Sequence, residues 1–102
     1  MPGRILQINF KFSMSRAELD AMVAGRAEAI AAVAGLQWKI WLINDEEQES
    51  GGLYLFADED SLDNYINGPL IEGLKNSPAI SAISVKKFAS LDAATTITHG
   101  PI

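Results

Sequence analysis

Two apolar runs, residues 35–43 and 51–57, limit the possible folds of this chain more than any other feature. Each run is rich in aromatic and branched residues and is bounded by glycine or by acidic residues, a pattern typical of a β-strand. Both faces of each run are apolar. In the first run Trp38, Ile40 and Leu42 point to one face, and Trp41 and Ile43 point to the other. In the second run Tyr54 and Phe56 point to one face, and Leu53, Leu55 and Ala57 point to the other. An antiparallel sheet with one wet face alternates apolar with polar residues, so here both faces need a cover. Helices of the same chain can cover one face, and a second copy of the chain is the simplest cover for the other.

The remaining segments supply two more strands and two helices. Residues 4–12 alternate cleanly, with apolar side chains on one face and polar ones on the other: Leu6, Ile8, Phe10 and Phe12 against Gln7, Asn9 and Lys11. A capping box at residues 15–18 predicts the start of the first helix, which stops at Gly35. Asp58 caps a second helix that Gly68-Pro69 interrupts, and residues 80–89 form the last strand.

This order of elements predicts a ferredoxin-like βαββαβ fold of the α+β class, a four-stranded antiparallel sheet with two helices on one face. We expect a single domain over residues 1–102, with a core at 4–89 and a C-terminal tail at 90–102. The other face of the sheet would leave a large apolar patch on a monomer, made by Trp41, Ile43, Leu53 and Leu55. Two such faces packed across a two-fold axis remove the patch, so the pattern predicts a homodimer.

Composition excludes several classes of function. The chain has no cysteine, which rules out disulfides and thiolate chemistry, and its one histidine, His99, lies in the tail and leaves no hydrolytic triad or two-histidine metal site. The net charge of −5 argues against nucleic acid as a partner. No apolar run approaches the length of a membrane span and no signal-peptide pattern is present, so we expect a cytoplasmic protein. We assign no metal and no cofactor.

After these exclusions the chain still offers aromatic side chains and a few polar groups that could line a cavity. Such a cavity is typical of a site for a small apolar ligand. Arg26 interrupts the apolar stripe of the first helix, and it either extends along its stem to water or points a cation into a cavity between helix and sheet. Tyr65 lies on the inner face of the second helix, where its hydroxyl either donates to a substrate oxygen or is satisfied within the core. His99 is the one residue of a type that commonly transfers protons near neutral pH.

Two segments, 35–41 (GLQWKIW) and 51–59 (GGLYLFADE), resemble the pattern of the small YdhR-type mono-oxygenases. The resemblance extends through Ser61 and Tyr65 to Lys86-Lys87-Phe88, and leaves residues 44–50 and the tail unmatched. It implies a dimeric α+β barrel, in the group that includes cofactor-independent quinol oxygenases and haem-degrading oxygenases. The pocket of that group usually lies between the sheet and the helices.

We expect three aromatic side chains to line this pocket: Trp38, Tyr54 and Phe56. Trp41 is expected in the dimer interface instead. Oxygenases of the group often carry an asparagine on the first strand inside the pocket. If the apolar residues of the first strand face the helices, strand parity puts Asn9 on the barrel side and Ile8 in the pocket position, so the sequence leaves open whether Asn9 faces the pocket or the barrel interior. Phe56 takes the position of a pocket tryptophan and no helix carries a histidine, so the resemblance does not extend to haem degradation.

These observations favour a cofactor-independent mono-oxygenase acting on a small aromatic or polycyclic compound, because an electron-rich phenol or quinol can itself supply electrons to oxygen. The candidate catalytic residues are Tyr65, Arg26 and His99. The candidate substrate-binding residues are Trp38, Tyr54, Phe56, Ile8 and Asn9. The alternatives are a non-catalytic small-molecule-binding or stress-response dimer, and an isomerase or decarboxylase of the same barrel group in which Tyr65, Arg26 or His99 moves protons.

Overall fold

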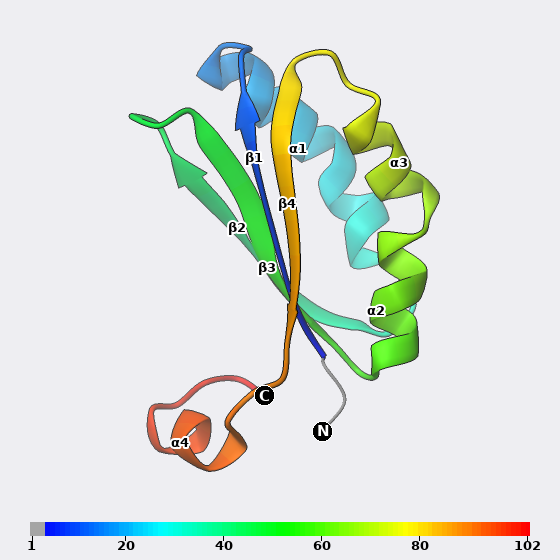
Figure 1. Cartoon of the computed structure of the whole chain (residues 1–102), viewed down its shortest axis with the longest axis vertical. Coiled ribbons are helices and arrows are strands. Elements are labelled where there is room, and N and C mark those ends of the chain that lie inside the picture. The colour runs from blue at the N-terminus through cyan, green and yellow to red at the C-terminus, as the bar shows by residue number, and fades with distance from the viewer. Residues whose placement is uncertain (1–3) are drawn as a thin grey trace.

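Four strands form one antiparallel sheet in the order β2-β3-β1-β4, which is the ferredoxin-like arrangement that the sequence predicts (Figure 1). The computed structural model describes residues 4–102. The elements of this part of the chain are β1 (Ile5–Phe12), α1 (Arg16–Ala31), β2 (Leu36–Asn44), β3 (Glu49–Phe56), α2 (Glu59–Ile66), α3 (Pro69–Lys75), β4 (Ile80–Phe88) and α4 (Asp92–Ile97).

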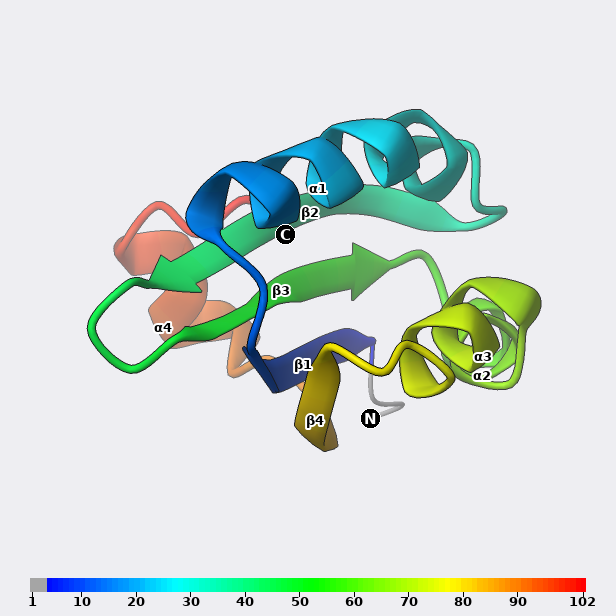
Figure 2. The ribbon, with the colours of Figure 1, turned by 90° about the horizontal axis from the view of Figure 1, so that it is seen from above.

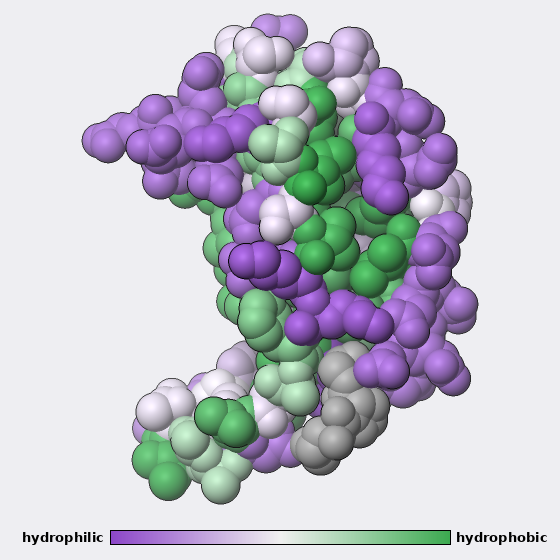
Figure 3. Space-filling view, viewed as in Figure 1, coloured by the Kyte–Doolittle hydropathy of each residue, from purple (hydrophilic) through white to green (hydrophobic). Residues whose placement is uncertain are grey.

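Three helices cover one face of the sheet, which we call the helical face. Seen from above, α1 lies along β2, whereas α2 and α3 lie on the far side of the same face, near β1 and β4 (Figure 2). The hydrophobic core fills the space between them, and its fully buried members include Leu6, Ile8, Phe56, Leu62 and Ile71. Burial of these side chains is the main stabilising term of the fold. Apolar side chains also gather in the hollow between the sheet and the helices, with polar residues on both sides of it (Figure 3).

The helix boundaries follow the local signals in the sequence. Ser15 Oγ accepts a hydrogen bond from the Glu18 amide at 3.1 Å, and the Ser15 amide donates to Glu18 Oε1 at 3.2 Å, which completes the predicted capping box of α1. Asp58 caps α2 by accepting from the Ser61 amide at 2.7 Å. Pro69 stands at the start of α3, so the predicted second helix is divided into α2 and α3 as expected.

The pairing of β2 with β3 corrects one prediction. Trp41 lies opposite Gly52, which in turn lies opposite Ile8 of β1, so Trp41 shares the helical face with Ile8. The prediction that Trp41 and Ile43 lie on the other face with Leu53 and Leu55 is therefore wrong. That face, which we call the outer face, instead carries Trp38, Ile40 and Leu42 beside Leu53 and Leu55. Both faces of this hairpin are apolar, so the hydrophobic pattern does not fix the register.

The tail follows β4 beyond the end of the sheet and contains a helix, α4, that the sequence did not predict and that stands off the strands (Figure 1). The Trp38 indole donates a hydrogen bond from Nε1 to the Pro101 carbonyl at 2.7 Å, which ties the end of the tail to β2. Leu55, on the outer face, is 1% exposed although it is not part of the main core cluster. Among the helices of residues 4–102, none is long and apolar enough to cross a membrane.

Candidate functional site

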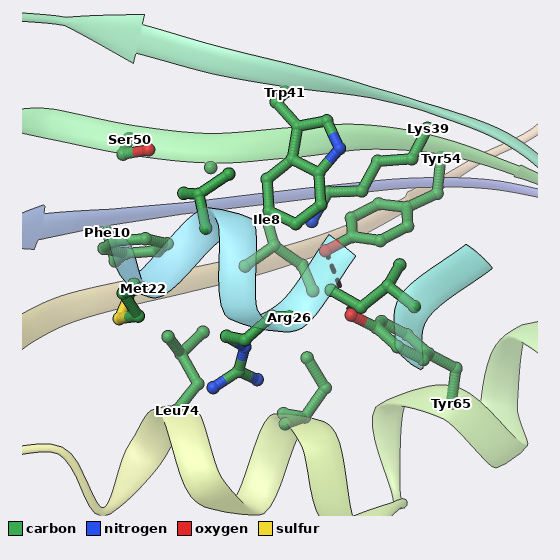
Figure 4. A pocket seen from close by; sticks show the side chains of 14 residues that line it. Ile8, Phe10, Met22, Arg26, Lys39, Trp41, Ser50, Tyr54, Tyr65 and Leu74 are labelled. Atoms are coloured by element: carbon green, nitrogen blue, oxygen red, sulfur yellow. Dashed lines mark hydrogen bonds between the residues drawn. The ribbon is translucent and has the colours of Figure 1, made fainter. Parts of the chain in front are cut away.

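A narrow cavity lies between the sheet and the helical layer, and we call it the inner cavity (Figure 4). Side chains from β1, β2, β3, α1, α2 and α3 line it. Most of them are apolar, and the polar ones are Arg26, Lys39, Ser50, Tyr54 and Tyr65. The free volume between these side chains is about 30 Å³, which is room for one or two water molecules and not for an aromatic ring.

Two buried tyrosines meet at the centre of the cavity. The hydroxyl oxygens of Tyr54, on β3, and Tyr65, on α2, are 3.1 Å apart and share a hydrogen bond. Their ring centroids are 5.2 Å apart, and Phe56 packs against both rings. Burial raises the pKa of both hydroxyls above the ordinary tyrosine value, so both stay protonated at neutral pH. Tyr65 therefore points into the predicted pocket, and its hydroxyl already has a partner within the protein.

Arg26 reaches into the cavity from α1 and does not extend to open water. Its Nη2 donates a hydrogen bond of 2.6 Å to the Leu70 carbonyl at the start of α3, and the side chain is half-buried. The sequence left open whether this cation extends to water or points into a cavity between helix and sheet. In the structure Arg26 lines the cavity, and its guanidinium binds α3 within the helical layer (Figure 4). The arginine also ties α1 to α3 across the helical layer.

The most unusual side chain of the cavity is Lys39, which sequence reasoning did not select. Its Nζ lies 3.2 Å from the centroid of the Trp41 ring and 4.5 Å from that of Tyr54. No carboxylate forms a salt bridge with it within residues 4–102. Burial, together with the positive charge of Arg26, lowers the pKa of Lys39 from 10.5 to about 7.

One signal in the sequence could have identified this lysine. Lys39 is the only charged residue of β2, within a run, residues 38–43, whose other members are all apolar, and it is two positions from Trp41 on the same face. Its partner on β3 is Tyr54, and Gly52, two residues before Tyr54 on the same face, lies opposite Trp41. A Cβ atom at Gly52 would overlap the end of the lysine side chain. A glycine diagonal to a lysine within an apolar hairpin thus marks space that is kept for a long side chain.

The other predicted site residues are divided between the two faces. Ile8 lines the inner cavity, as strand parity predicts. Phe56 lies in the core against the tyrosine pair. Asn9 lies on the outer face, where its Oδ1 accepts a hydrogen bond from Gln7 at 2.9 Å.

Four of the predicted residues do not line the inner cavity. Asn9 lies on the outer face, and Phe56 is a core residue behind the tyrosine pair, so its predicted place in the pocket wall is wrong. Trp38 lies on the outer face, so its predicted place in the pocket is wrong, and Trp41 takes the position that was expected for Trp38. The reason is the register of β2, which a bulge between Leu36 and Trp38 also affects. His99 is exposed in the tail, just after α4.

A second hollow, the outer groove, lies between the end of α1 and the pair α2 and α3. It has a free volume of about 250 Å³ and is lined mainly by small and apolar residues. Tyr65 lines both the outer groove and the inner cavity, and Leu70, whose carbonyl binds Arg26, also lines the groove. The tyrosine and the Arg26–Leu70 hydrogen bond thus stand between the two spaces.

No group of three or more histidine, aspartate or glutamate side chains that could hold a metal ion is present in the described residues 4–102. The fold and the inner cavity together define the class, a ferredoxin-like α+β protein with an internal site between its sheet and its helices.

The family described as "Putative mono-oxygenase ydhR" matches residues 5–101, so the chain belongs to this family. The match confirms the resemblance seen in the sequence and extends it through most of the tail. No curated protein sequence matches this chain.

Solved structures with the same fold are distant in sequence. A protein of unknown function from Nitrosomonas europaea superposes with a TM-score of 0.74 at 21% identity, over 89% of this chain and 91% of the other. SnoaB, a cofactor-independent oxygenase from Streptomyces nogalater, gives 0.70 at 16% identity, over 89% and 95%. The haem degrader MhuD from Mycobacterium tuberculosis, solved with two haems in its active site, gives 0.64 at 19% identity, over 85% and 95%. At these identities the similarity shows the shared fold alone.

Proposed function

We propose that this chain is a cofactor-independent mono-oxygenase and that the inner cavity is its active site. Its substrate is a small aromatic or polycyclic compound that carries a phenol, a quinol or an enolisable ring ketone. Membership of the mono-oxygenase family supports the reaction class, and the similarity to SnoaB supports the absence of a cofactor.

The observation that carries the proposal is the meeting of Arg26, Lys39, Tyr54 and Tyr65 in one apolar cavity between sheet and helices. The aromatic side chains offer flat surfaces for a ring, and the hydroxyls and cations offer hydrogen bonds to a substrate oxygen. Such groups act strongly because the surrounding side chains exclude water.

The chemistry needs only the substrate and oxygen. Once ionised, an electron-rich ring gives its electrons to O₂ without a metal or flavin. For a ring methylene the balanced reaction is R₂CH₂ + O₂ → R₂C=O + H₂O, in which one oxygen atom enters the product and the other leaves as water. The protein's part is to bind the ring, to favour its ionised form and to keep bulk water away from the reactive carbon.

A substrate must widen the inner cavity, because the free volume of about 30 Å³ holds no ring. We propose that it approaches through the outer groove, whose free volume is about 250 Å³. Rotation of Tyr65 and release of Arg26 from the Leu70 carbonyl would join the two spaces. Lid and side-chain movements of this kind are common steps of enzyme cycles.

Oxygen consumption tests the proposal. Chelator-treated protein should consume oxygen with anthrone or hydroquinone, with no added metal or flavin, faster than the uncatalysed reaction and with one O₂ used per ring oxidised. Heat-inactivated protein supplies the background. Consumption at the background rate across a panel of phenols, quinols and anthrones would remove the oxygenase function.

A second candidate function is non-catalytic binding of the same kind of ligand. Two observations favour this alternative: the inner cavity has little free volume, and Tyr54 and Tyr65 already form a hydrogen bond with each other. Saturable binding of the same compounds, measured by calorimetry, without oxygen consumption would support this alternative.

We also propose that the working unit is a homodimer in which a second copy covers the outer face. Ile40 and Phe88 support this, because they lie on that face and are 49% and 45% exposed. Exposed apolar side chains on one face of a sheet are what two sheets bury when they pack face to face.

A further inference from the structure

The charges around the inner cavity do not balance. Arg26 enters from α1 and Lys39 from β2, while β3 and α2 contribute neutral tyrosines, Tyr54 and Tyr65 (Figure 4). The residues from β1 and α3 are apolar, and no aspartate or glutamate of the described chain lines the cavity. An ammonium group in this partly buried space loses hydration and is repelled by Arg26, so the charged form of Lys39 is destabilised until an anion joins it.

The fold keeps a place for the lysine in spite of this repulsion. The amine lies on the faces of Trp41 and Tyr54, and within residues 4–102 no oxygen acceptor is seen for it. Cation–π contacts replace only part of the hydration that an ammonium group loses on burial. Because a side chain at Gly52 would overlap the lysine stem, the glycine is what allows the amine to lie inside the sheet's helical face.

We propose that the inner cavity binds its substrate as an anion, a phenolate or an enolate, and that Lys39 is the group that receives the substrate's proton. The step is R–OH + H₂N–Lys39 → R–O⁻ + ⁺H₃N–Lys39. The O–H bond breaks, an N–H bond forms, and the two charges remain in contact. The substrate class is then a weak acid with an aromatic ring. This inference deepens the proposed function, because it assigns the substrate of the same cavity.

The neighbouring groups are consistent with Lys39 as the proton acceptor, and none of them competes with it for the substrate's proton. The lowered pKa of Lys39, about 7, leaves a large share of the amine neutral at physiological pH, and a neutral amine can accept a proton. The raised pKa values of Tyr54 and Tyr65 keep both tyrosines protonated, so they act as hydrogen-bond donors to the new anion. The Arg26 guanidinium, on the α1 side of the cavity, holds the second side of the anion.

4-Nitrophenol tests the inference, because its phenolate absorbs visible light and its neutral form does not. At pH about 7, where about half of the free compound is neutral and a large share of Lys39 is an uncharged amine, addition of wild-type protein should produce a phenolate band above that of the free compound. Lys39→Met keeps the length of the side chain and removes the amine, so it should remove the band and weaken binding roughly 10- to 100-fold. Lys75→Met, at an exposed lysine of α3, should behave as wild type.

A second ligand and a second variant keep the result interpretable. 4-Nitroanisole has no acidic proton and should bind wild type and Lys39→Met equally, which shows that the variant keeps its cavity. Should Lys39→Met fail to fold by circular dichroism, Lys39→Gln takes its place. Bound nitrophenol that stays neutral, an equal band in Lys39→Met, or no binding by wild type up to about millimolar ligand would each overturn the inference.

The readout does not depend on oxygen chemistry, because nitrophenol is a poor electron donor. A phenolate band without oxygen consumption on quinols would reject the mono-oxygenase function and keep the anion site. Oxygen consumption by a protein that shows no phenolate band would keep the function and reject Lys39 as proton acceptor.

Discussion

The hydroxyl groups of Tyr54 and Tyr65 have two roles: they stabilise the fold by their hydrogen bond, and they line the candidate site. Each hydroxyl satisfies the other at 3.1 Å in a cavity with little room for water. A buried polar group that loses its partner destabilises a protein more than the bond itself stabilises it. The two roles can therefore be separated by removing one hydroxyl and then both.

Tyr65→Phe should lower the free energy of unfolding by about 1–3 kcal/mol, because Tyr54 is left without a partner. The double variant Tyr54→Phe with Tyr65→Phe should recover part of this loss, since no unpaired hydroxyl remains. If Tyr65 also binds the substrate oxygen, turnover of anthrone should fall by roughly 10- to 1,000-fold in both variants. Chemical denaturation and oxygen uptake measure the two effects, and wild-type turnover in the double variant would exclude the catalytic role.

Lys39 makes a different contribution to stability, and its sign depends on pH. Its pKa is about 7 in the folded protein and 10.5 ordinarily, so between these values the unfolded chain binds a proton that the folded chain does not. The free energy of unfolding should therefore rise with pH from about 7 to about 10. Above pH about 10 the buried tyrosines act in the opposite direction, because the unfolded chain loses their protons first.

Lys39→Met should be more stable than wild type at pH 6 by about 1–3 kcal/mol, a range reduced for partial access to solvent, and should lack the rise above pH 7. Urea denaturation at pH about 6, 8 and 9.5 measures the curve. Lys75→Met serves as the control and should keep the wild-type curve. A Lys39→Met variant that is less stable than wild type at pH 6 would show that burial of the charged amine does not destabilise the fold.

At the scale of the elements, the parts that local sequence signals specify were predicted well. Strand β1 alternates apolar and polar residues, and the caps at Ser15 and Asp58 begin α1 and α2 where expected. The break at Gly68-Pro69 was also predicted. These features depend on neighbours in sequence, so one segment contains all the information needed.

The parts that depend on pairing between segments were not predictable in the same way. Trp38 and Trp41 were assigned to the wrong faces because β2 and β3 are apolar on both sides, and the register that exchanges them satisfies the pattern equally well. Lys39 was missed as a consequence, since its place in the inner cavity depends on the same register. Helix α4 has only six residues and buries none of them, so it lacks an apolar stripe that could predict it.

The turn from α1 to β2 links three elements through Gly35. Its φ of +83° lies in the left-handed region, and its carbonyl accepts from the Ala57 amide at 2.7 Å. A Cβ at this position would overlap the side chain of Ser61 on α2. The glycine thus lets α1, β3 and α2 approach one another at the mouth of the outer groove.

Gly35→Ala should destabilise the fold by about 1–3 kcal/mol, from backbone strain and the overlap with Ser61. Gly25→Ala is the matched control: Gly25 lies within α1, nothing lies within 4 Å of its Cβ position, and alanine there should stabilise by about 0.5–1 kcal/mol. Opposite shifts in melting temperature for the two variants are the expected result. Equal shifts would show that the left-handed turn is not required.

At the scale of the whole molecule, the two faces of the sheet differ in how they are covered. The helical face is packed by α1, α2 and α3, whereas the outer face is covered only in part, where the tail meets Trp38 through Pro101. Ile40 and Phe88 remain exposed on it. A second copy of the chain that covers these residues would need an interface of roughly 1,000 Å² or more to be stable.

One pair of residues on β2 tests this interface with its own control. Ile40 is 49% exposed on the outer face and Ile43 is 44% exposed on the helical face, so the two have the same chemistry and similar access to solvent but point in opposite directions. Ile40→Glu should convert a dimer to a monomer, because a carboxylate would be buried without a partner between the sheets. Ile43→Glu should remain dimeric.

Light scattering at about 100 μM protein gives the mass of each form, and wild type should have twice the mass of the chain at this concentration. Wild-type protein that scatters as a monomer, or equal dissociation of both variants, would show that the outer face is not the interface.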